Sequence, residues 1–289
     1  MRSIKKLMIG LLAVLGLALG MGIPTPQPFS SVETVQASHQ IKLQGARNVR
    51  DLGGYQTSTK QKVKPRLLLR SAKLASLTHK DKQLLEHRYH LQTVVDLRTP
   101  AVIARTPDAK IPGVQLLKEP VVSDKTMVSV NRVAAVSGTK SMVKMYQSFV
   151  TTAQARHAYR QLFLQLLKAP GNRATLWHCS EGKDRTGFGT ALVLTALGVP
   201  QKTIYQDYLA SNTYNKASIN GQLSALKHQG ASKQALARKK ATLIVKRSYL
   251  DAAYHAADKR YGSIQGYLTK GLGLSKSNIA QLRQHYLLK

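Results

Sequence analysis

The sequence is short of cysteine, because its 289 residues include one, Cys179. A single thiol cannot form an internal disulfide, so a disulfide-stapled scaffold is excluded. One cysteine and nine scattered histidines also give no ligand spacing for a zinc site, and no metal is expected. The function of the lone thiol therefore has to be inferred from the residues around it.

Acidic residues are also scarce. The chain has 13 Asp and Glu against 44 Lys and Arg, a formal net charge of +31. Such a charge produces a strong field that attracts anionic surfaces. Nucleic acid, an anionic cell-surface polymer, anionic lipid and a phosphorylated substrate are candidate partners. The alternative is a solvated basic surface without a specific partner.

The first residues are typical of a secretory signal peptide. Arg2, Lys5 and Lys6 precede an apolar run over residues 7–23, and a small-residue sequence ends at Ala37. The run is slightly short for a membrane span of ~20 residues, so cleavage after Ala37 is favoured over an uncleaved anchor. We therefore expect a secreted or extracytoplasmic protein associated with the cell surface, where an anionic polymer or lipid is accessible and no specific nucleic acid is bound.

Residues 38–289 are expected to form a single domain, because they contain no internal repeat and no Gly/Ser linker after residue 40. Apolar and β-branched runs predict strands at 66–70, 93–98, 114–122 and 174–178. Periodicity and capping residues predict helices at 78–87, 140–149, 155–167, 186–197, 217–246, 248–259 and 279–287, with further helices after Pro100 and through Tyr208. The stretch 123–138 has weak periodicity and is expected to be a loop. This alternation predicts an α/β fold with a mainly parallel central sheet flanked by helices, in which ligands bind at the carboxyl ends of strands.

The lone cysteine lies where such a strand is expected to end, in the run His178-Cys179-Ser180-Glu181-Gly182-Lys183-Asp184-Arg185-Thr186-Gly187. A strand, a short loop and a helix N-terminus form an anion site, and the same field lowers the pKa of a cysteine thiol. Arg185 offers a planar guanidinium that matches two phosphate oxygens. Gly182 allows the loop to curve closely around an anion. We expect His178 to orient the loop and the Thr186 hydroxyl to stabilise the Cys179 sulfur as a leaving group.

The run His-Cys-x5-Arg-Thr-Gly resembles the signature of cysteine-dependent protein tyrosine phosphatases. Its Gly-Lys-Asp variant is similar to the bacterial tyrosine and lipid phosphatases, which act on phosphotyrosine, phosphoserine/threonine or phosphoinositides. Segments that resemble the same family cover most of the chain after the leader: Asn48–Tyr55, Leu69–Ala72, Val94–Pro100 and Tyr261–Ser263. The resemblance implies a tyrosine phosphatase-like fold, a phosphorylated protein or phosphoinositide as substrate, no cofactor and a monomer.

The resemblance also implies roles for the residues of the loop. Cys179 attacks phosphorus to give a cysteinyl-phosphate, which water then hydrolyses. Residues 180–183 and Arg185 bind the phosphate: Ser180, Glu181, Gly182, Lys183 and Arg185. Two of these depart from the family pattern, since Glu181 stands where alanine is frequent and Ser180 where some lipid phosphatases have lysine.

The general acid has two candidates. Asp184 is the choice that the family implies, because it lies inside the loop, and its alternative role is to brace the loop by hydrogen bonding. Asp124 is the second candidate, because it lies in the expected loop after the strand 114–122. Asp51 and Arg98 are expected either to support the site from neighbouring strand ends or to form structural salt bridges. Lys183 either adds positive charge for a substrate or is a solvated lysine.

Two functions follow from this reading. The favoured one is a secreted cysteine-dependent phosphatase, and the alternative is a catalytically weak cationic protein that uses a phosphatase fold to bind anions. The basic helical region 216–247 is expected to act as a lid or as an adhesion surface. No Walker loop is present, because the spaced upstream glycine is missing and Asp184 replaces the Ser/Thr.

Overall fold

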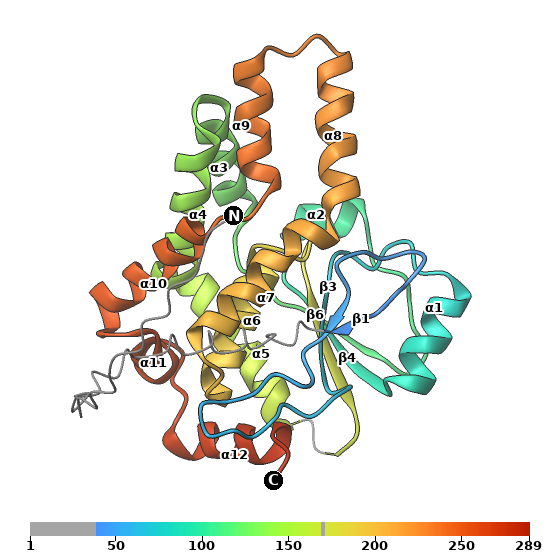
Figure 1. The fold of residues 1–289 in the computed structure, drawn as a ribbon, viewed down its shortest axis with the longest axis vertical. Coiled ribbons are helices and arrows are strands. Elements are labelled where there is room, and N and C mark those ends of the chain that lie inside the picture. The colour runs from blue at the N-terminus through green and yellow to red at the C-terminus, as the bar shows by residue number, and fades with distance from the viewer. Residues whose placement is uncertain (1–38, 169–170) are drawn as a thin grey trace, which may run out of the picture. The chain divides into compact units, whose positions relative to one another are not determined.

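The computed structural model describes residues 39–168 and 171–289, which belong to one compact unit (Figure 1). The predicted signal peptide and its cleavage position lie outside the described residues. Among the described residues, none of the helices combines the length and the apolar character that a membrane crossing requires.

A six-stranded sheet with the order β1-β2-β3-β6-β4-β5 organises the fold. Strands β3, β6, β4 and β5 run parallel, while β1 and β2 add an antiparallel edge. The bounds are β1 His39–Gln40, β2 Arg50–Asp51, β3 Leu68–Ser71, β4 Leu91–Asp96, β5 Gln115–Lys118 and β6 Ala174–His178. The prediction of a mainly parallel sheet is confirmed.

The register of the central strands determines where the site can form. Ser71 of β3 and Asp96 of β4 both pair with His178 of β6, so the three strands end together. The residues that follow these strands therefore meet at one edge of the sheet, which is where parallel α/β sheets bind ligands. Cys179 is the first residue beyond this edge.

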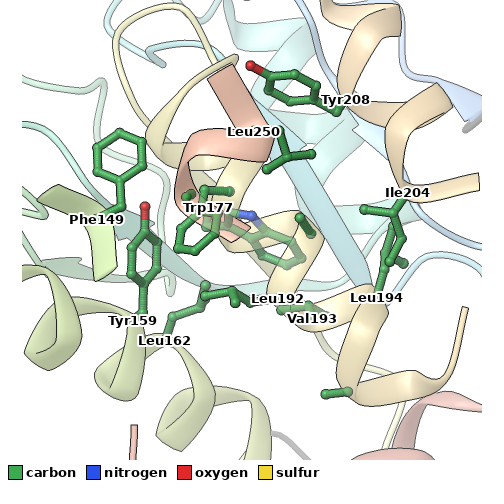
Figure 2. Close-up of a cluster of buried hydrophobic side chains, with 14 of the residues drawn as sticks. Phe149, Tyr159, Leu162, Trp177, Leu192, Val193, Leu194, Ile204, Tyr208 and Leu250 are labelled. Carbon is green, nitrogen blue, oxygen red and sulfur yellow. The ribbon is translucent and has the colours of Figure 1, made fainter. Parts of the chain in front are cut away.

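The sheet separates two apolar cores. Leu69, Val94 and Leu176 face the smaller core, which the helical segment 79–88 covers. Their chain neighbours face the larger core, because successive strand residues point to opposite sides; Trp177 is an example. Aromatic and aliphatic side chains surround Trp177 in this core (Figure 2).

Helices cover both faces of the sheet (Figure 1). Their bounds are α1 His79–Gln83, α2 Pro100–Arg105, α3 Asp124–Val136, α4 Gly138–Thr151, α5 Ala153–Lys168, α6 Arg185–Leu197, α7 Gln201–Tyr214, α8 Lys216–His228, α9 Lys233–Leu243, α10 Arg247–Tyr261, α11 Ile264–Gly266 and α12 Lys276–Tyr286. Two π-helical turns, η1 Leu84–Arg88 and η2 Tyr267–Gly271, continue α1 and α11. Local residues set the ends of some helices. Thr78 begins α1 by forming a capping box with Asp81, and Gly198 ends α6 in the left-handed conformation.

The prediction of a loop over residues 123–138 is wrong, because most of this stretch is helix α3. The Ser123 side chain caps the helix by accepting a hydrogen bond from the Thr126 amide at 3.0 Å. Val130 is the one buried residue of α3, whereas Val128 and Val136 are 58% and 82% exposed. Met127 and Val130 lie on the side of α3 that packs on the core, but the exposed valines add apolar residues elsewhere on the helix, so the helical periodicity is weak in the sequence.

The basic region 216–247 is largely helical, as predicted, but it forms two helices rather than one. Helices α8 and α9 form a hairpin that projects from the sheet (Figure 1). Gly230 lies in the turn between them with φ of +78°, a conformation that favours glycine.

Candidate active site

Strand β6 delivers Cys179 into a loop that ends where helix α6 begins at Arg185. The Cys179 side chain is buried. Burial alone would raise the pKa of its thiol, but the Arg185 charge and the neighbouring Thr186 hydroxyl and amide more than offset this, so the pKa is lowered. The Thr186 hydroxyl is buried and forms no hydrogen bond of its own with the described residues, so it is available to the sulfur. These surroundings favour a thiolate at Cys179.

Gly182 allows the loop to approach strand β3. Its φ is +64°, and a Cβ on it would lie 2.4 Å from the Ser71 backbone oxygen. An Arg70 Nη2 donates to the Gly182 carbonyl at 2.7 Å, and Asn48 Nδ2 donates to the same oxygen at 2.9 Å. The Gly182 carbonyl is thus held on the outer side of the loop by two donors.

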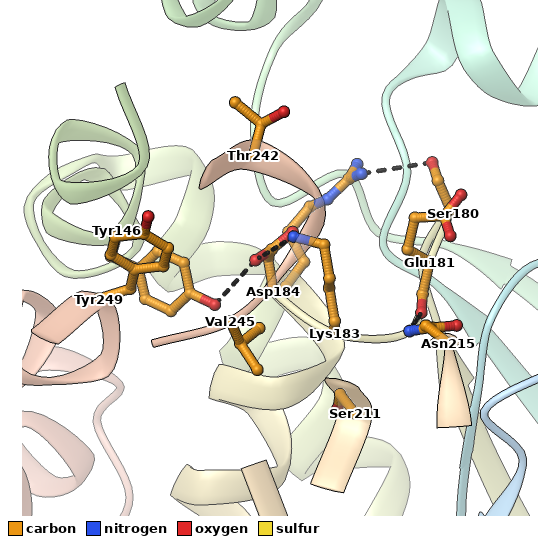
Figure 3. Close-up of polar contacts among 12 residues, drawn as sticks. Tyr146, Ser180, Glu181, Lys183, Asp184, Ser211, Asn215, Thr242, Val245 and Tyr249 are labelled. Carbon is orange, nitrogen blue, oxygen red and sulfur yellow. Dashed lines mark hydrogen bonds and ion pairs between the residues drawn. The ribbon is translucent and has the colours of Figure 1, made fainter. Parts of the chain in front are cut away.

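Further donors hold the carbonyl of the preceding residue. Asn48 Nδ2 donates to the Glu181 carbonyl at 3.1 Å. Asn215 Nδ2 donates to the same oxygen, also at 3.1 Å (Figure 3). Carbonyls that are held outward leave the amides of the loop free to face an anion, as an anion-binding loop requires. Neither asparagine was assigned a role from the sequence: Asn48 lies in a segment that resembles the phosphatase family, and Asn215 lies in none of them.

A buried carboxylate orients the arginine that holds Gly182. Asp207 of helix α7 forms ion pairs with Arg70 Nη1 and with Arg50 Nη1, the second at 2.8 Å. All three side chains are at most 1% exposed, and removing one partner of such a pair leaves an uncompensated buried charge. Asp207 was missed in the sequence because nothing local distinguishes it from other helical acids.

Arg185 has few partners of its own. Its Nη2 lies 3.4 Å from Ser180 Oγ and its Nη1 lies 3.4 Å from the Leu97 carbonyl, both at the long limit of a hydrogen bond. The Tyr159 hydroxyl donates to the Arg185 carbonyl at 3.0 Å and fixes the backbone. The guanidinium is therefore placed beside Cys179 with donors left for an anion.

Asp184 lies at the edge of the loop, and two donor groups make three hydrogen bonds to its carboxylate. Tyr146 donates its hydroxyl at 2.9 Å, and Lys183 Nζ lies 2.8 and 3.0 Å from the two oxygens (Figure 3). The Tyr208 hydroxyl donates to Tyr146 at 2.8 Å. Burial and the charge of Asp184 raise the pKa of both tyrosines well above the ordinary value, so both stay protonated as donors.

This arrangement also locates Lys183, which is 3% exposed and paired with Asp184. It is therefore not the solvated lysine that one reading of the sequence allowed. Its charge instead compensates the Asp184 carboxylate.

His178 and Arg98 belong to a buried charge cluster behind the loop. His178 Nε2 lies 2.9 Å from Asp108 Oδ2, and the His178 Nδ1 lies 3.3 Å from the Cys179 carbonyl. Arg98 pairs with Asp108 at 2.8 Å and with Asp96 at 2.6 Å. Burial lowers the pKa of His178, but the hydrogen bond to Asp108 and the charges of Asp96 and Asp108 raise it by more than burial lowers it. The pKa of His178 is therefore above its ordinary value. Arg98 thus forms structural salt bridges, and one of them holds Asp108, the residue that orients His178.

Three atoms of this cluster, from Asp96, Asp108 and His178, lie within 4.8 Å of one another, as metal ligands would. Arg98 already pairs with both carboxylates. A cation would have to displace that guanidinium, so these residues do not fit a metal ion.

Two of the predicted supporting residues are not brought to the loop. Asp51 accepts hydrogen bonds from the Gly53 amide at 2.9 Å and the Arg66 amide at 2.8 Å, which braces the turns between β2 and β3. Asp124, the second candidate for the acid, is the first residue of α3 and accepts from the Ala101 amide at 3.2 Å. The expectation that it follows a strand in a loop was wrong, and its carboxylate faces the N-terminal turn of α2.

Glu181, the residue that departs from the family pattern, forms an ion pair with Arg47. Arg47 Nη2 lies 2.7 and 2.9 Å from the two carboxylate oxygens. Both side chains are partly exposed, so the pair is screened by solvent. The pairing nonetheless offsets the negative charge that Glu181 adds to the loop.

A cavity of about 560 Å³ opens over the loop. Its floor includes Glu181, Asp184 and Arg185, and its walls come from α3, α4, α8 and α9. Helix α9 contributes Arg238 and Lys239. The predicted lid region therefore lines the candidate site.

The fold and the geometry of the loop define the class of this protein. It is a phosphatase whose site consists of a cysteine and an arginine on a strand-loop-helix unit. Comparison with known proteins agrees: residues 41–288 match the model of the tyrosine phosphatase family. The chain is 32% identical to a candidate tyrosine-protein phosphatase of Cupriavidus necator, over 88% of this chain and 90% of the relative. It is 30% identical to the triple specificity protein phosphatase PtpB of Mycobacterium tuberculosis, over 84% of this chain and 97% of the relative.

Among solved structures, TpbA of P. aeruginosa is similar over 63% of this chain and 90% of its own, with 19% identity and a TM-score of 0.30. That likeness adds no argument about function. The family match covers nearly all of the described residues, and the chain belongs to the tyrosine phosphatase family.

Proposed function

We propose that this phosphatase hydrolyses phosphomonoesters through a cysteinyl-phosphate intermediate on Cys179. The observation that carries the proposal is the environment of the thiol, whose pKa is lowered by Arg185 and Thr186 although burial opposes this. A thiolate beside the Arg185 guanidinium, which makes only two long side-chain contacts, suits attack on a phosphoryl group, because one cation stabilises both the attacking and the transferred group.

In the first step a sulfur-phosphorus bond forms and the phosphorus-oxygen bond to the alcohol breaks. Asp184 donates the proton that the leaving oxygen needs. Its place within the loop and its partial exposure, with 15% of the side chain accessible, support this role. The hydroxyl of Tyr146 and the ammonium of Lys183 keep the carboxyl group in position.

In the second step water attacks phosphorus, and the sulfur-phosphorus bond breaks. The Asp184 carboxylate accepts the proton of the water, which returns the group to its acid form. The Cys179 sulfur leaves as a thiolate, which the Thr186 hydroxyl stabilises. Inorganic phosphate is released and the loop is ready for another cycle.

Hydrolysis of an aryl phosphate by wild type and by Cys179→Ser tests the proposal. We expect the variant to release no aryl alcohol above background, and a rapidly quenched wild-type reaction to contain protein with one added phosphoryl group. Equal release by both proteins would leave the alternative function, a cationic anion-binding protein on a phosphatase fold.

The substrate class is also a proposal. Phosphotyrosine is favoured by family membership. PtpB of Mycobacterium tuberculosis is a triple specificity protein phosphatase, which supports a range wider than phosphotyrosine, and we propose phosphoserine/threonine and phosphoinositides as further substrates. Met127, Met142 and Met145 give the cavity apolar walls, while Arg238 and Lys239 add positive charge. A panel of phosphopeptides and phosphoinositides compared by kcat/KM tests this range; activity on phosphotyrosine alone would exclude the wider reading.

We further infer that the α8–α9 hairpin acts as a lid. Cys179 is 1% exposed, so a substrate phosphate reaches its sulfur only if neighbouring groups move. The hairpin lines the cavity through Gln222 of α8 and several residues of α9. Shortening the hairpin is expected to change KM and its salt dependence more than the chemical step, and unchanged values would exclude a lid.

Secretion remains a proposal that rests on the leader. Amino-terminal sequencing of protein recovered from the culture medium tests it, with a first residue of Ser38 expected after cleavage at Ala37. Recovery of the intact leader from the membrane fraction would identify an uncleaved anchor instead.

A further inference from the structure

A second depression lies on the outer side of helices α4 and α10, which pack side by side (Figure 1). Its volume is about 770 Å³. The lining residues are Lys144, Gln147, Ser148 and Thr151 of α4, and His255, Ala256, Lys259 and Arg260 of α10. We refer to these eight residues as the basic depression.

The basic depression and the catalytic cavity use opposite sides of α4. Lys144, Gln147 and Thr151 recur at helical spacing on the exposed side, whereas Met145 and Tyr146 are buried. Met145 lines the catalytic cavity and Tyr146 contacts Asp184. A ligand on the outer side of α4 would therefore leave the catalytic cavity open.

The charge of the depression is entirely positive. Lys144, Lys259 and Arg260 are exposed cations, His255 adds a fourth basic group, and no carboxylate is among the described residues that line it. The nearest acid in the sequence, Asp258, lines a different cavity. Because no lining group neutralises the cations, their field is available to an anionic ligand.

The remaining lining groups indicate which kind of anion fits. Gln147, Ser148 and Thr151 are polar, and Ala256 has a small side chain. The large exposed apolar side chains of the described residues lie elsewhere: Leu116, Val128, Val136 and Leu288. A membrane-surface site combines cations with apolar side chains that enter the lipid, and a single-stranded nucleic acid site adds aromatic groups for stacking. The basic depression has cations, hydrogen-bonding groups and one small apolar residue, Ala256, but no large apolar or aromatic side chain, which suits a polymer of phosphate groups.

We propose that the basic depression binds a linear phosphate-rich polymer and holds the enzyme on it with the catalytic cavity open. The binding is electrostatic and involves no step of the phosphatase reaction. Success or failure of this proposal is therefore separate from that of the catalytic mechanism.

The test compares two triple variants of equal charge, with long-chain inorganic polyphosphate as the probe. Lys144→Gln/Lys259→Gln/Arg260→Gln removes the cations of the depression. Lys62→Gln/Lys118→Gln/Lys276→Gln removes three exposed lysines from other surfaces, none of which forms an ion pair with another described residue.

We expect the first variant to bind polyphosphate at least about tenfold more weakly at fixed salt. The slope of log K against log salt should fall by about two, since three phosphate contacts contribute about 0.7 each for a single-stranded polyanion. The second variant should bind like wild type. Both should hydrolyse a small aryl phosphate like wild type, which shows that they are folded.

Three results would overturn the proposal. Equal losses in the two variants would mean that the net charge, and no particular surface, attracts the polymer. Displacement of polyphosphate by saturating vanadate would place the polymer in the catalytic cavity. Tighter binding to phosphatidylglycerol vesicles than to polyphosphate, lost in the first variant, would identify a lipid surface as the partner.

Discussion

Gly182→Ala is expected to show how far activity depends on the shape of the loop, because the substitution changes no charged or reacting group. The added Cβ meets the Ser71 backbone oxygen at 2.4 Å, and the φ of +64° is one that alanine rarely adopts. The left-handed conformation costs about 1–2 kcal/mol for a residue with a Cβ. The overlap adds about 1–3 kcal/mol, the usual cost of overpacking, since backbone cannot rotate away as a side chain can.

Gly113→Ala is a matched control for the first of these costs. Gly113 has φ of +68°, but nothing lies within 4 Å of its Cβ position. Its variant should show the conformational cost alone. The difference between the two variants in free energy of unfolding, measured by urea titration, therefore isolates the overlap at Gly182. The loss of unfolded-chain entropy on Gly→Ala is common to both and cancels.

The activities of Gly182→Ala and Gly113→Ala should differ more than their free energies of unfolding. Moving the loop away from Ser71 disturbs the hydrogen bonds of Arg70 and Asn48 to the Gly182 carbonyl, at 2.7 and 2.9 Å. A displacement of about 1 Å in a catalytic group costs about 100-fold, so kcat/KM for an aryl phosphate should fall about 100-fold in Gly182→Ala and little in Gly113→Ala. Equal activities in the two variants would refute the view that the contact with β3 sets the loop geometry.

Three other predictions concern the reacting groups. Asp184→Asn should lower kcat by about 10²–10⁴-fold, the usual contribution of a general acid, while Asp124→Asn should leave it nearly unchanged; the reverse result in steady-state kinetics would move the acid to Asp124. Thr186→Val should raise the pKa of Cys179, because the hydroxyl stabilises the thiolate, and the rate of iodoacetamide alkylation should then rise at a higher pH than in wild type; coincident pH curves would contradict this. Hydrogen peroxide should inactivate the enzyme and bound phosphate should slow the loss, since a thiolate oxidises readily and no second cysteine is present to protect it; a resistant enzyme would count against a lowered pKa.

The four parallel strands of the sheet were predictable because each is specified locally, whereas the two-residue strands β1 and β2 were not predicted. Strand β6 occupies Ala174–His178, as its apolar and β-branched residues predicted, and α6 ends at Leu197 before Gly198. Helix α3 was not predictable in this way. Its apolar side is short, with Val130 buried and Met127 partly buried, and exposed Val128 and Val136 obscure the pattern in the sequence. Its helical state therefore depends on its cap and on packing against neighbouring helices.

The contacts of the candidate supporting residues were likewise not predictable from the sequence near each residue. His178 is held by Asp108, which follows a turn after α2 and carries no motif. Asp124 was the second candidate for the acid, because the stretch around it was expected to be a loop. Only the fold shows that its carboxylate accepts from the Ala101 amide instead of facing the cavity. In both cases the sequence showed which side chain could act as an acid or a partner, but it did not show which group that side chain contacts in the fold.

The sequence by itself determined the candidate nucleophile, the arginine beside it and the candidate anion-binding loop, because these groups lie within ten consecutive residues and a strand-loop-helix unit brings them together locally. Tertiary structure decided what holds that loop in shape. Asn48 and Arg70 reach the Gly182 carbonyl across 134 and 112 positions of the chain, and Asp207 orients Arg70 across 137. Buried polar groups need partners wherever the fold can supply them, and which distant residues become those partners depends on sheet register and helix packing.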